Sequence, residues 1–380
     1  NYNVVKGKTI RVTAAVDRNI RSTAVMAGAG GSAAVNGSIL ILSIGAKTTD
    51  SDADNANING GNGSSSKASS DAAKQGQAAV NAGYGQSIGA GSQSNPYVDQ
   101  VNADLAALKN ETSDLVSEYF STANVSDKTF AGIGNGGSTT ATGGDITVEA
   151  SEKTTVNAAA GTASASGSAS VGISMIVAIV NGTSEAVLGG QAEAINGNIQ
   201  VHAINELNIE KFIAVGGGAS GAVSVAGTIT VLKVGETAAA YIANGAVVTA
   251  DGSVIVLAES AQNILVINGN VTASGAVSAG VATNVIKFSN ETRSYIGQNA
   301  KVTAKGLLAG IDFVDGNTTS TVNSNYKNLN GRSSETTDYV SSTSNKANQK
   351  GVLVGAKSSQ KIRSWVISGA ASGTVAATGS

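Results

Sequence analysis

The feature that most constrains this chain is a stretch that it repeats. The segment YIANGAVVTADGSVIVLAES begins at Tyr241, and the related YIGQNAKVTAKG begins 54 residues later. Two sets of glycines mark the same period, with intervals of 53, 55 and 54 in the first set and of 54 and 54 in the second: Gly144, Gly197, Gly252 and Gly306, and Gly167, Gly221 and Gly275. A fixed period of this size is typical of a solenoid, in which each unit buries its apolar face only against its neighbours.

The pattern within each unit is that of β-strands. Val254 and Val256 alternate with Ile255 and Leu257, and the runs are rich in Val, Ile and Thr and bounded by Asn-Gly, Asp-Gly or Gly-Gly turns. With 48 glycines and only 4% aromatic residues, the interior must be narrow. The sequence therefore predicts an all-β fold, a right-handed parallel β-helix (β-solenoid) with modules of about 54 residues. We expect each module to divide into about three coils of roughly 18 residues.

Extra length between marker glycines indicates two insertions in this scaffold. Gly7 and Gly31 extend the periodic pattern towards the N-terminus, and Gly373 extends it towards the C-terminus. We therefore assign residues 1–50, 130–313 and 359–380 to the β-helix, and residues 51–129 and 314–358 to the insertions. Because a solenoid normally carries a polar cap and neither end shows one, we expect the repeats to continue beyond this segment or to stack on copies of the chain.

The insertions are the places where binding to a partner is expected. The first begins with a polar, flexible loop and continues, after the only proline, with an amphipathic helix over residues 97–120. This helix is expected to dock on a flank of the solenoid or to meet a partner chain. The second insertion is polar and rich in Thr and Ser. The candidate partner-binding residues are Val98, Val101, Leu105, Leu108, Leu115 and Tyr119 of the helix, with Tyr326 and Tyr339 of the second insertion.

Candidate metal ligands are few. Asp50, Asp52 and Asp54 resemble the first three ligands of a calcium loop, but Asn55 stands where the loop needs glycine and Gly61 where it needs glutamate. A solvated acidic loop is the favoured interpretation. His202, the only histidine, has no second histidine or cysteine with which to form a metal or catalytic site, so we expect it at the surface.

One pair of carboxylates keeps an enzymatic alternative open. Parallel β-helices also host polysaccharide lyases and hydrolases, which need clustered carboxylates on one face. Asp312 and Asp315 are the nearest such pair, beside the second insertion. Because two carboxylates beside a loop are far more often solvated than catalytic, we expect a protein that is not an enzyme and has no cofactor.

Composition argues against several other classes. The net charge is −2 and Lys and Arg form no block, so no nucleic-acid partner is expected. The longest apolar run, VGISMIVAIV, has ten residues, about half of a bilayer span, so no membrane span is expected. The chain has no cysteine, which excludes disulfides and thiolate sites.

Some strands are apolar on both faces. The runs SILILSI, ISMIVAIV and TITVLKV carry apolar or small residues at nearly every position. Strands of this kind are usually covered on both faces. We therefore expect one flat flank of the solenoid to pack against the inserted helix, a neighbouring sheet or a second chain.

The repeats resemble a known family. The units NGTSEAVLGGQAEAINGNIQVHAIN, GETAAAYIANGAVVTADGSVIVLAES and NETRSYIGQNAKVTAKG are similar to the repeat regions of very large bacterial surface exoproteins, the two-partner-secretion adhesins of the filamentous-haemagglutinin and leukotoxin-like type. The resemblance covers the scaffold and neither insertion. It implies export through a partner outer-membrane pore, a fibre on the cell surface, and adhesion to a protein or glycan receptor on host cells or other bacteria.

These observations predict a non-enzymatic stalk or adhesin segment of a secreted or cell-surface bacterial fibre. Two alternatives stay open: a subunit of a self-assembling extracellular filament, joined end to end or along the flat flank, and a carbohydrate-active β-helix enzyme.

Overall fold

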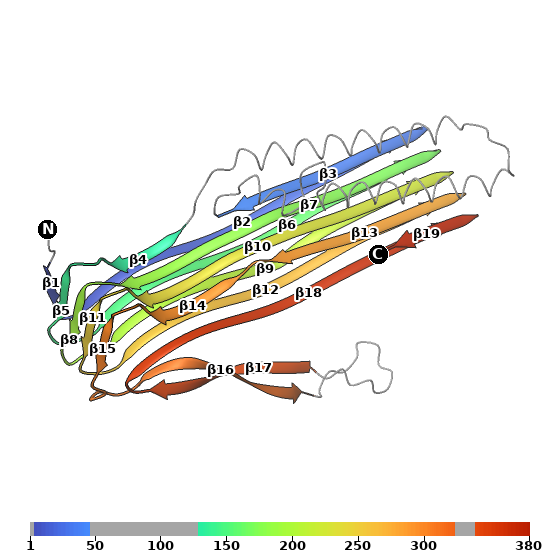
Figure 1. The fold of residues 1–380 in the computed structure, drawn as a ribbon. Coiled ribbons are helices and arrows are strands. Elements are labelled where there is room, and N and C mark those ends of the chain that lie inside the picture. The colour runs from blue at the N-terminus through green and yellow to red at the C-terminus, as the bar shows by residue number, and fades with distance from the viewer. Residues whose placement is uncertain (1–3, 46–127, 324–338) are drawn as a thin grey trace.

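The computed structural model describes residues 4–45, 128–323 and 339–380, and every regular element in these residues is a β-strand (Figure 1). Three sheets of parallel strands run side by side, and the chain passes through them in turn. The predicted all-β, parallel, stacked arrangement is thus confirmed. Within the described residues, no helix is long and apolar enough to cross a membrane.

The first sheet contains short strands of four residues. Its order follows the sequence from one rung to the next. The strands are β1 (Val4–Gly7), β5 (Ser138–Ala141), β8 (Gln191–Ala194), β11 (Val247–Ala250) and β15 (Lys301–Ala304).

The second sheet contains five long strands, most of 21 residues. They are β2 (Ile10–Gly30), β6 (Ile146–Ser166), β9 (Ile199–Ser220), β12 (Val254–Ser274) and β18 (Val352–Ser372). Strands in globular proteins usually have 3–10 residues. The length is possible here because the alternating pattern runs through each segment without a breaking turn.

The third sheet faces the second and also contains long strands. They are β3 (Ala33–Ile44), β7 (Ala169–Leu188), β10 (Val223–Ile242), β13 (Val277–Phe288) and β19 (Val375–Gly379). Two shorter strands continue the first and last full rungs. These are β4 (Thr129–Ile133), which pairs with β7 after β3 has ended, and β14 (Glu291–Ile296), which pairs with β10 after β13 has ended.

The pairing register shows how long one winding is. Val223 of β10 pairs with Ala169 on one side and with Val277 on the other, 54 residues away in each direction. The expected coils of about 18 residues are therefore wrong, because one winding takes in a short strand and two long ones. A bulge at Glu210 shifts the register between β6 and β9 and accounts for unequal glycine intervals.

The marker glycines lie in rows, one above another. A Cβ atom on Gly221 would come within 2.1 Å of the Gly167 carbonyl oxygen, and one on Gly275 within 2.1 Å of the Gly221 carbonyl oxygen. In the other row, the Gly252 amide donates to the Gly197 carbonyl at 2.9 Å. Only glycine allows this backbone approach, which explains why the sequence returns to it once per winding.

The two long sheets converge towards the end of the coil opposite the short strands. There Ser170 and Ser224 share a hydrogen bond of 3.0 Å in the interior, and a Cβ on Gly218 would come within 2.5 Å of the Ser224 hydroxyl. The segments without bulky side chains, such as GGGAS and GTASASGSAS, lie at this taper. The lack of bulk follows from the small distance between the sheets.

A polar belt divides the interior into two apolar cores. One core surrounds Ile146, Val201 and Val256 near the short strands, and the other surrounds Phe212 and Leu232. The belt between them is formed by Arg18, Glu152, Asn205, Glu236, Gln262 and Asn290. Charges inside a protein are stable only when they are paired and hydrogen-bonded.

The contacts of the belt satisfy this requirement. Arg18 Nη1 lies 2.5 Å from Glu152 Oε1, and the Thr183 amide donates to Glu152 Oε2 at 3.1 Å. Gln262 donates through Nε2 to Glu236 Oε2 at 3.0 Å. Burial, opposed by this hydrogen bond and reinforced by the nearby Glu152 carboxylate, raises the pKa of Glu236 to about 7.

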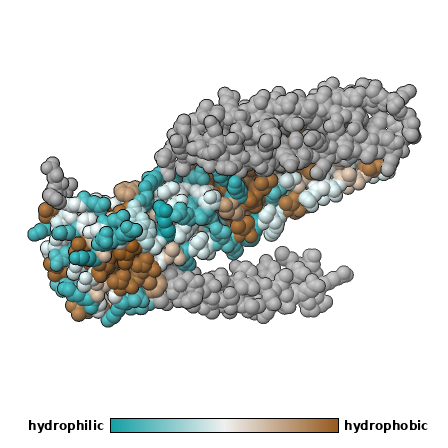
Figure 2. All heavy atoms as spheres, viewed as in Figure 1, coloured by the Kyte–Doolittle hydropathy of each residue, from teal (hydrophilic) through white to brown (hydrophobic). Residues whose placement is uncertain are grey.

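The last rung leaves core positions open. Val352, Val354 and Ile362 of β18 are 41%, 39% and 42% exposed, whereas their partners in β12 are fully buried. Figure 2 shows a hydrophobic patch at the end of the molecule that carries the short strands.

Both insertions interrupt the scaffold at its edges. The first leaves after β3 and returns at β4. The second contains an antiparallel hairpin of β16 (Ile311–Asn323) and β17 (Tyr339–Gln349). Parallel pairing resumes at Val352, so the sequence-based boundary at 358 falls inside β18.

Candidate functional site

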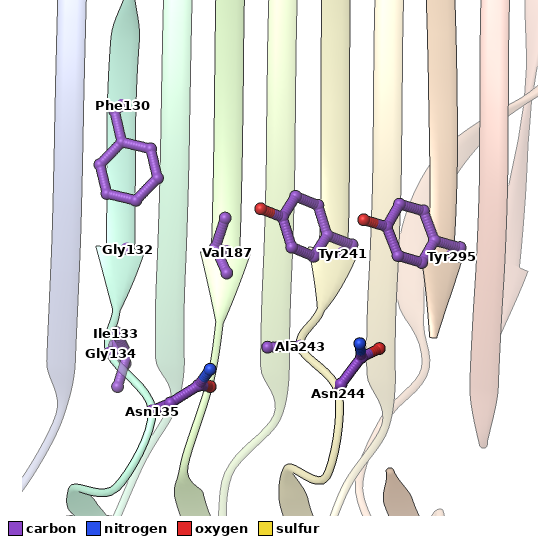
Figure 3. Close-up of a pocket in the computed structure, with 10 residues that line it drawn as sticks. All are labelled: Phe130, Gly132, Ile133, Gly134, Asn135, Val187, Tyr241, Ala243, Asn244 and Tyr295. Carbon is purple, nitrogen blue, oxygen red and sulfur yellow. The ribbon is translucent and has the colours of Figure 1, made fainter. Parts of the chain in front are cut away.

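A groove of about 480 Å³ lies on the outer face of the third sheet, where its strands approach the short-strand end (Figure 3). Its residues come from β4, β7, β10 and β14 and from the turns after β4 and β10. They are Phe130, Gly132, Ile133, Gly134, Asn135, Val187, Tyr241, Ala243, Asn244 and Tyr295.

One row of paired residues forms the floor and one wall of the groove. Gly132, Val187, Tyr241 and Tyr295 are matched partners on four neighbouring strands. Their side chains point outward because Ala186 and Ala240, the preceding residues, belong to the core. The rings of Tyr241 and Tyr295 stack with their centroids 4.8 Å apart and their planes 4° apart, which matches the spacing of adjacent strands.

Phe130 forms the opposite wall. Its ring lies over Gly132, since a Cβ atom there would come within 2.6 Å of the ring. Figure 3 shows Val187 between Phe130 and Tyr241. Two strand spacings of about 4.8 Å separate β4 from β10, so about 6 Å remains between the two aromatic walls after the thickness of the rings is subtracted. This width accepts one ring-shaped group above Val187.

A short hydrogen-bonded chain fixes the wall at Tyr241. The Tyr241 hydroxyl donates to Glu185 Oε1 at 2.5 Å, and Lys128 forms a salt bridge with Glu185 Oε2. Burial raises the pKa of Glu185, but the hydrogen bonds from Lys128 and Tyr241 outweigh it and the net pKa is lowered. Burial and the bond to Glu185 raise the pKa of Tyr241. Glu185 therefore stays ionised and Tyr241 stays neutral at physiological pH.

The charges around the groove are balanced. Lys128 is paired with Glu185 and also lies 5.1 Å from the centre of the Phe130 ring, and Arg293 is paired with Glu291 at 2.9 Å. A ligand thus meets aromatic faces and no uncompensated charge from these four side chains.

Two carboxamides supply polar groups at one end of the groove. Figure 3 shows Asn135 and Asn244 on the same side, beyond Val187 and Tyr241. Asn244 Oδ1 accepts the Gln298 amide at 2.8 Å, which holds its side chain in place. Apolar walls with a few fixed polar groups are the usual composition of a small-ligand site.

The residues singled out from the sequence lie elsewhere. His202 is at the surface of β9, as expected, with Nε2 3.0 Å from Glu259 Oε2, and this hydrogen bond lowers the pKa of Glu259. Asp312 is exposed on β16 and accepts a hydrogen bond from Asn348 at 2.7 Å. In the described residues no group of three or more acidic or histidine side chains could hold a metal ion.

The other predicted residues give no information on this groove. Tyr339 opens β17, opposite Asn323. Outside the described residues lie the inserted helix 97–120 and the residues Asp50, Asp52, Asp54, Val98, Val101, Leu105, Leu108, Leu115, Tyr119 and Tyr326.

Sequence reasoning missed the groove, although one signal was present. Tyr241 and Tyr295 occupy the same position in consecutive repeats, and in a parallel stack equivalent residues become neighbours. Phe130 gave no such signal, because it follows directly after the first insertion and is not part of a repeated motif.

No family model, curated protein or solved structure matches this chain.

Proposed function

We propose that this chain is a non-enzymatic adhesin segment of a secreted or cell-surface bacterial fibre, and that the groove between Phe130 and Tyr241 binds a glycan receptor. The resemblance of its repeats to exoproteins of the filamentous-haemagglutinin type supports the setting. The observation that carries the binding role is the pair of aromatic walls on rigid strands, separated by the width of one ring.

Several properties favour a sugar over other ligands. Pyranose rings present C–H groups that stack on aromatic faces, and their hydroxyls pair with carboxamides such as those of Asn135 and Asn244. The groove is shallow and small, so it suits one or two sugar units better than a folded protein surface. Because Lys128 and Arg293 are already paired with carboxylates, a neutral sugar is favoured over an acidic one.

We further propose that the scaffold is a right-handed β-solenoid with one module of about 54 residues per winding. Parallel strands joined by crossovers are right-handed in about 98% of cases. The paired residues 54 positions apart, together with the rows of glycines, support the module length.

The binding proposal can be tested on an oligosaccharide array, followed by calorimetry with the sugars retained. Phe130→Ala and Tyr295→Ala should each weaken binding about tenfold or more, as loss of an aromatic contact does at binding sites. Trp365→Ala is the matched control, since Trp365 is 56% exposed on β18 of the opposite sheet. Absence of binding to any neutral sugar, or equal affinity of all three variants and the parent, would refute the proposal.

A second candidate function is assembly into a filament. The open core positions of β18, Val352, Val354 and Ile362, would become buried if a further rung from another copy stacked on them. Sedimentation velocity distinguishes the two functions: rods that lengthen with protein concentration favour assembly, whereas a concentration-independent monomer contradicts it.

A further inference from the structure

The outer face of the third sheet is buried where an open sheet would be wet. Apolar residues at alternate positions from Ala169 to Ile179 of β7 and from Val223 to Val231 of β10 point away from the interior. Met175, Val177 and Val231 are nevertheless only 2%, 0% and 3% exposed. We call this surface the covered face.

The opposite long sheet provides an internal comparison. Val215, Val271 and Ile367 occupy outward positions on that sheet and are 48%, 66% and 60% exposed. Both sheets have the same kind of strand and the same alternation, so orientation alone does not bury Met175 or Val177. Another part of the molecule must lie over them.

No described strand from another sheet contributes to this surface. The two apolar clusters of the covered face contain residues of β3, β7, β10, β13 and the turns before β10 and β13. The inward residues of the same strands, such as Ile176 and Leu232, belong to a separate core between the sheets. The cover must therefore come from outside the described residues, or from a second molecule.

The place where the first insertion leaves and returns identifies the occupant. The chain leaves the scaffold after Ile44 and re-enters at Thr129, and the strands on both sides of this gap pair with β7. Ile39 and Ile41, a few residues before the exit, already pack against the covered face. The 82 residues from 46 to 127 thus begin and end at this surface.

The sequence of the insertion fits the surface in length and pattern. We propose that segment 97–120 of this chain lies along the covered face, with its apolar stripe against Met175, Val177 and Val231. A helix of this length extends about 36 Å, and the strand from Ala169 to Ile179 extends about 33 Å. Six apolar residues at spacings of three and four supply a stripe that needs such a partner.

Thiol labelling tests the proposal directly, because the chain contains no cysteine. Val177→Cys reports on the covered face and Val271→Cys is the matched exposed control. We expect the thiol at 177 to react about 100-fold more slowly than the thiol at 271 at every protein concentration. Replacing residues 46–127 by a short Gly-Ser linker, or introducing Leu105→Asp with Leu108→Asp in the full chain, should make the two rates similar.

Two results would overturn this inference. Labelling at 177 that accelerates on dilution of the full chain would mean that a second copy provides the cover. Labelling at 177 that stays slow in the monomeric deletion variant would mean that the scaffold buries the position itself. The double aspartate variant decides the matter if the deletion variant does not fold.

Discussion

Glu236 gives the sharpest test of the interior. Its carboxyl group lies 2% exposed in the polar belt and accepts a hydrogen bond from Gln262 Nε2, while its backbone amide donates to Asn290. Glu152, itself paired with Arg18, faces it across the interior. Glu236→Gln keeps the size of the side chain and an oxygen that can accept the Gln262 bond, and removes only the charge.

The magnitude follows from the raised pKa. The pKa of Glu236 rises from 4.5 to about 7 on folding, and each unit corresponds to 1.36 kcal/mol, so about 3 kcal/mol is involved. Below pH 4.5 both the folded and the unfolded chain carry the proton. As the pH rises from 4.5 to about 7, the unfolded chain ionises first, so the parent protein loses about 3 kcal/mol of stability.

Urea unfolding followed by circular dichroism measures this difference. At about pH 9, Glu236→Gln should be more stable than the parent by up to about 3 kcal/mol, and at about pH 4 the two should agree. Glu206→Gln, at an exposed position of β9, is the control and should change stability by less than about 0.5 kcal/mol at either pH. A difference for Glu236→Gln that does not depend on pH, or a parent that gains stability as pH rises through this range, would refute the reasoning.

Three further predictions concern the stack, the core and the groove. Gly221→Ala should cost about 2 kcal/mol or more in urea unfolding, because its Cβ would collide with the glycine carbonyl one rung away, whereas Gly31→Ala, with nothing within 4 Å, should be neutral; equal effects would contradict the glycine rows. Phe212→Ala should cost about 3–5 kcal/mol in the same assay, since Phe212 is fully buried, and a loss below about 1 kcal/mol would place it outside the core. Tyr241→Phe removes the hydroxyl that donates to Glu185, so the pKa of Glu185, followed by carbon NMR, should rise, while an unchanged pKa would mean that this hydrogen bond does not form.

The sequence was sufficient to predict what repeats. Glycines at equal intervals predicted the rows that Gly167, Gly221 and Gly275 form, and the alternation of Val254 with Ile255 predicted strands with one face inward. Runs such as ISMIVAIV predicted strands buried on both faces, and Met175 to Val180 are buried without interruption. These properties are local or periodic, so a single chain is enough to reveal them.

The sequence was not sufficient for what depends on the distance between sheets. Gly216 to Gly218 resemble a turn, yet they lie within β9 where the two long sheets converge, and this misled the estimate of coil size. Glu152 and Glu236 resemble exposed strand residues, yet they face each other inside. The groove joins Phe130 to Tyr241 across an insertion, which no spacing rule connects.

The central claim is that equivalent residues of successive windings lie directly above one another. Asp17, Lys153, Glu206, Ala261 and Ser359 form one such row of outward residues across five strands. Nitroxide labels on Asp17→Cys and Ser359→Cys measure its length in the otherwise cysteine-free chain. Four strand spacings of about 4.8 Å predict a narrow distance distribution near about 20 Å, widened only by the label arms. A distribution centred beyond about 40 Å would contradict the stacked parallel register.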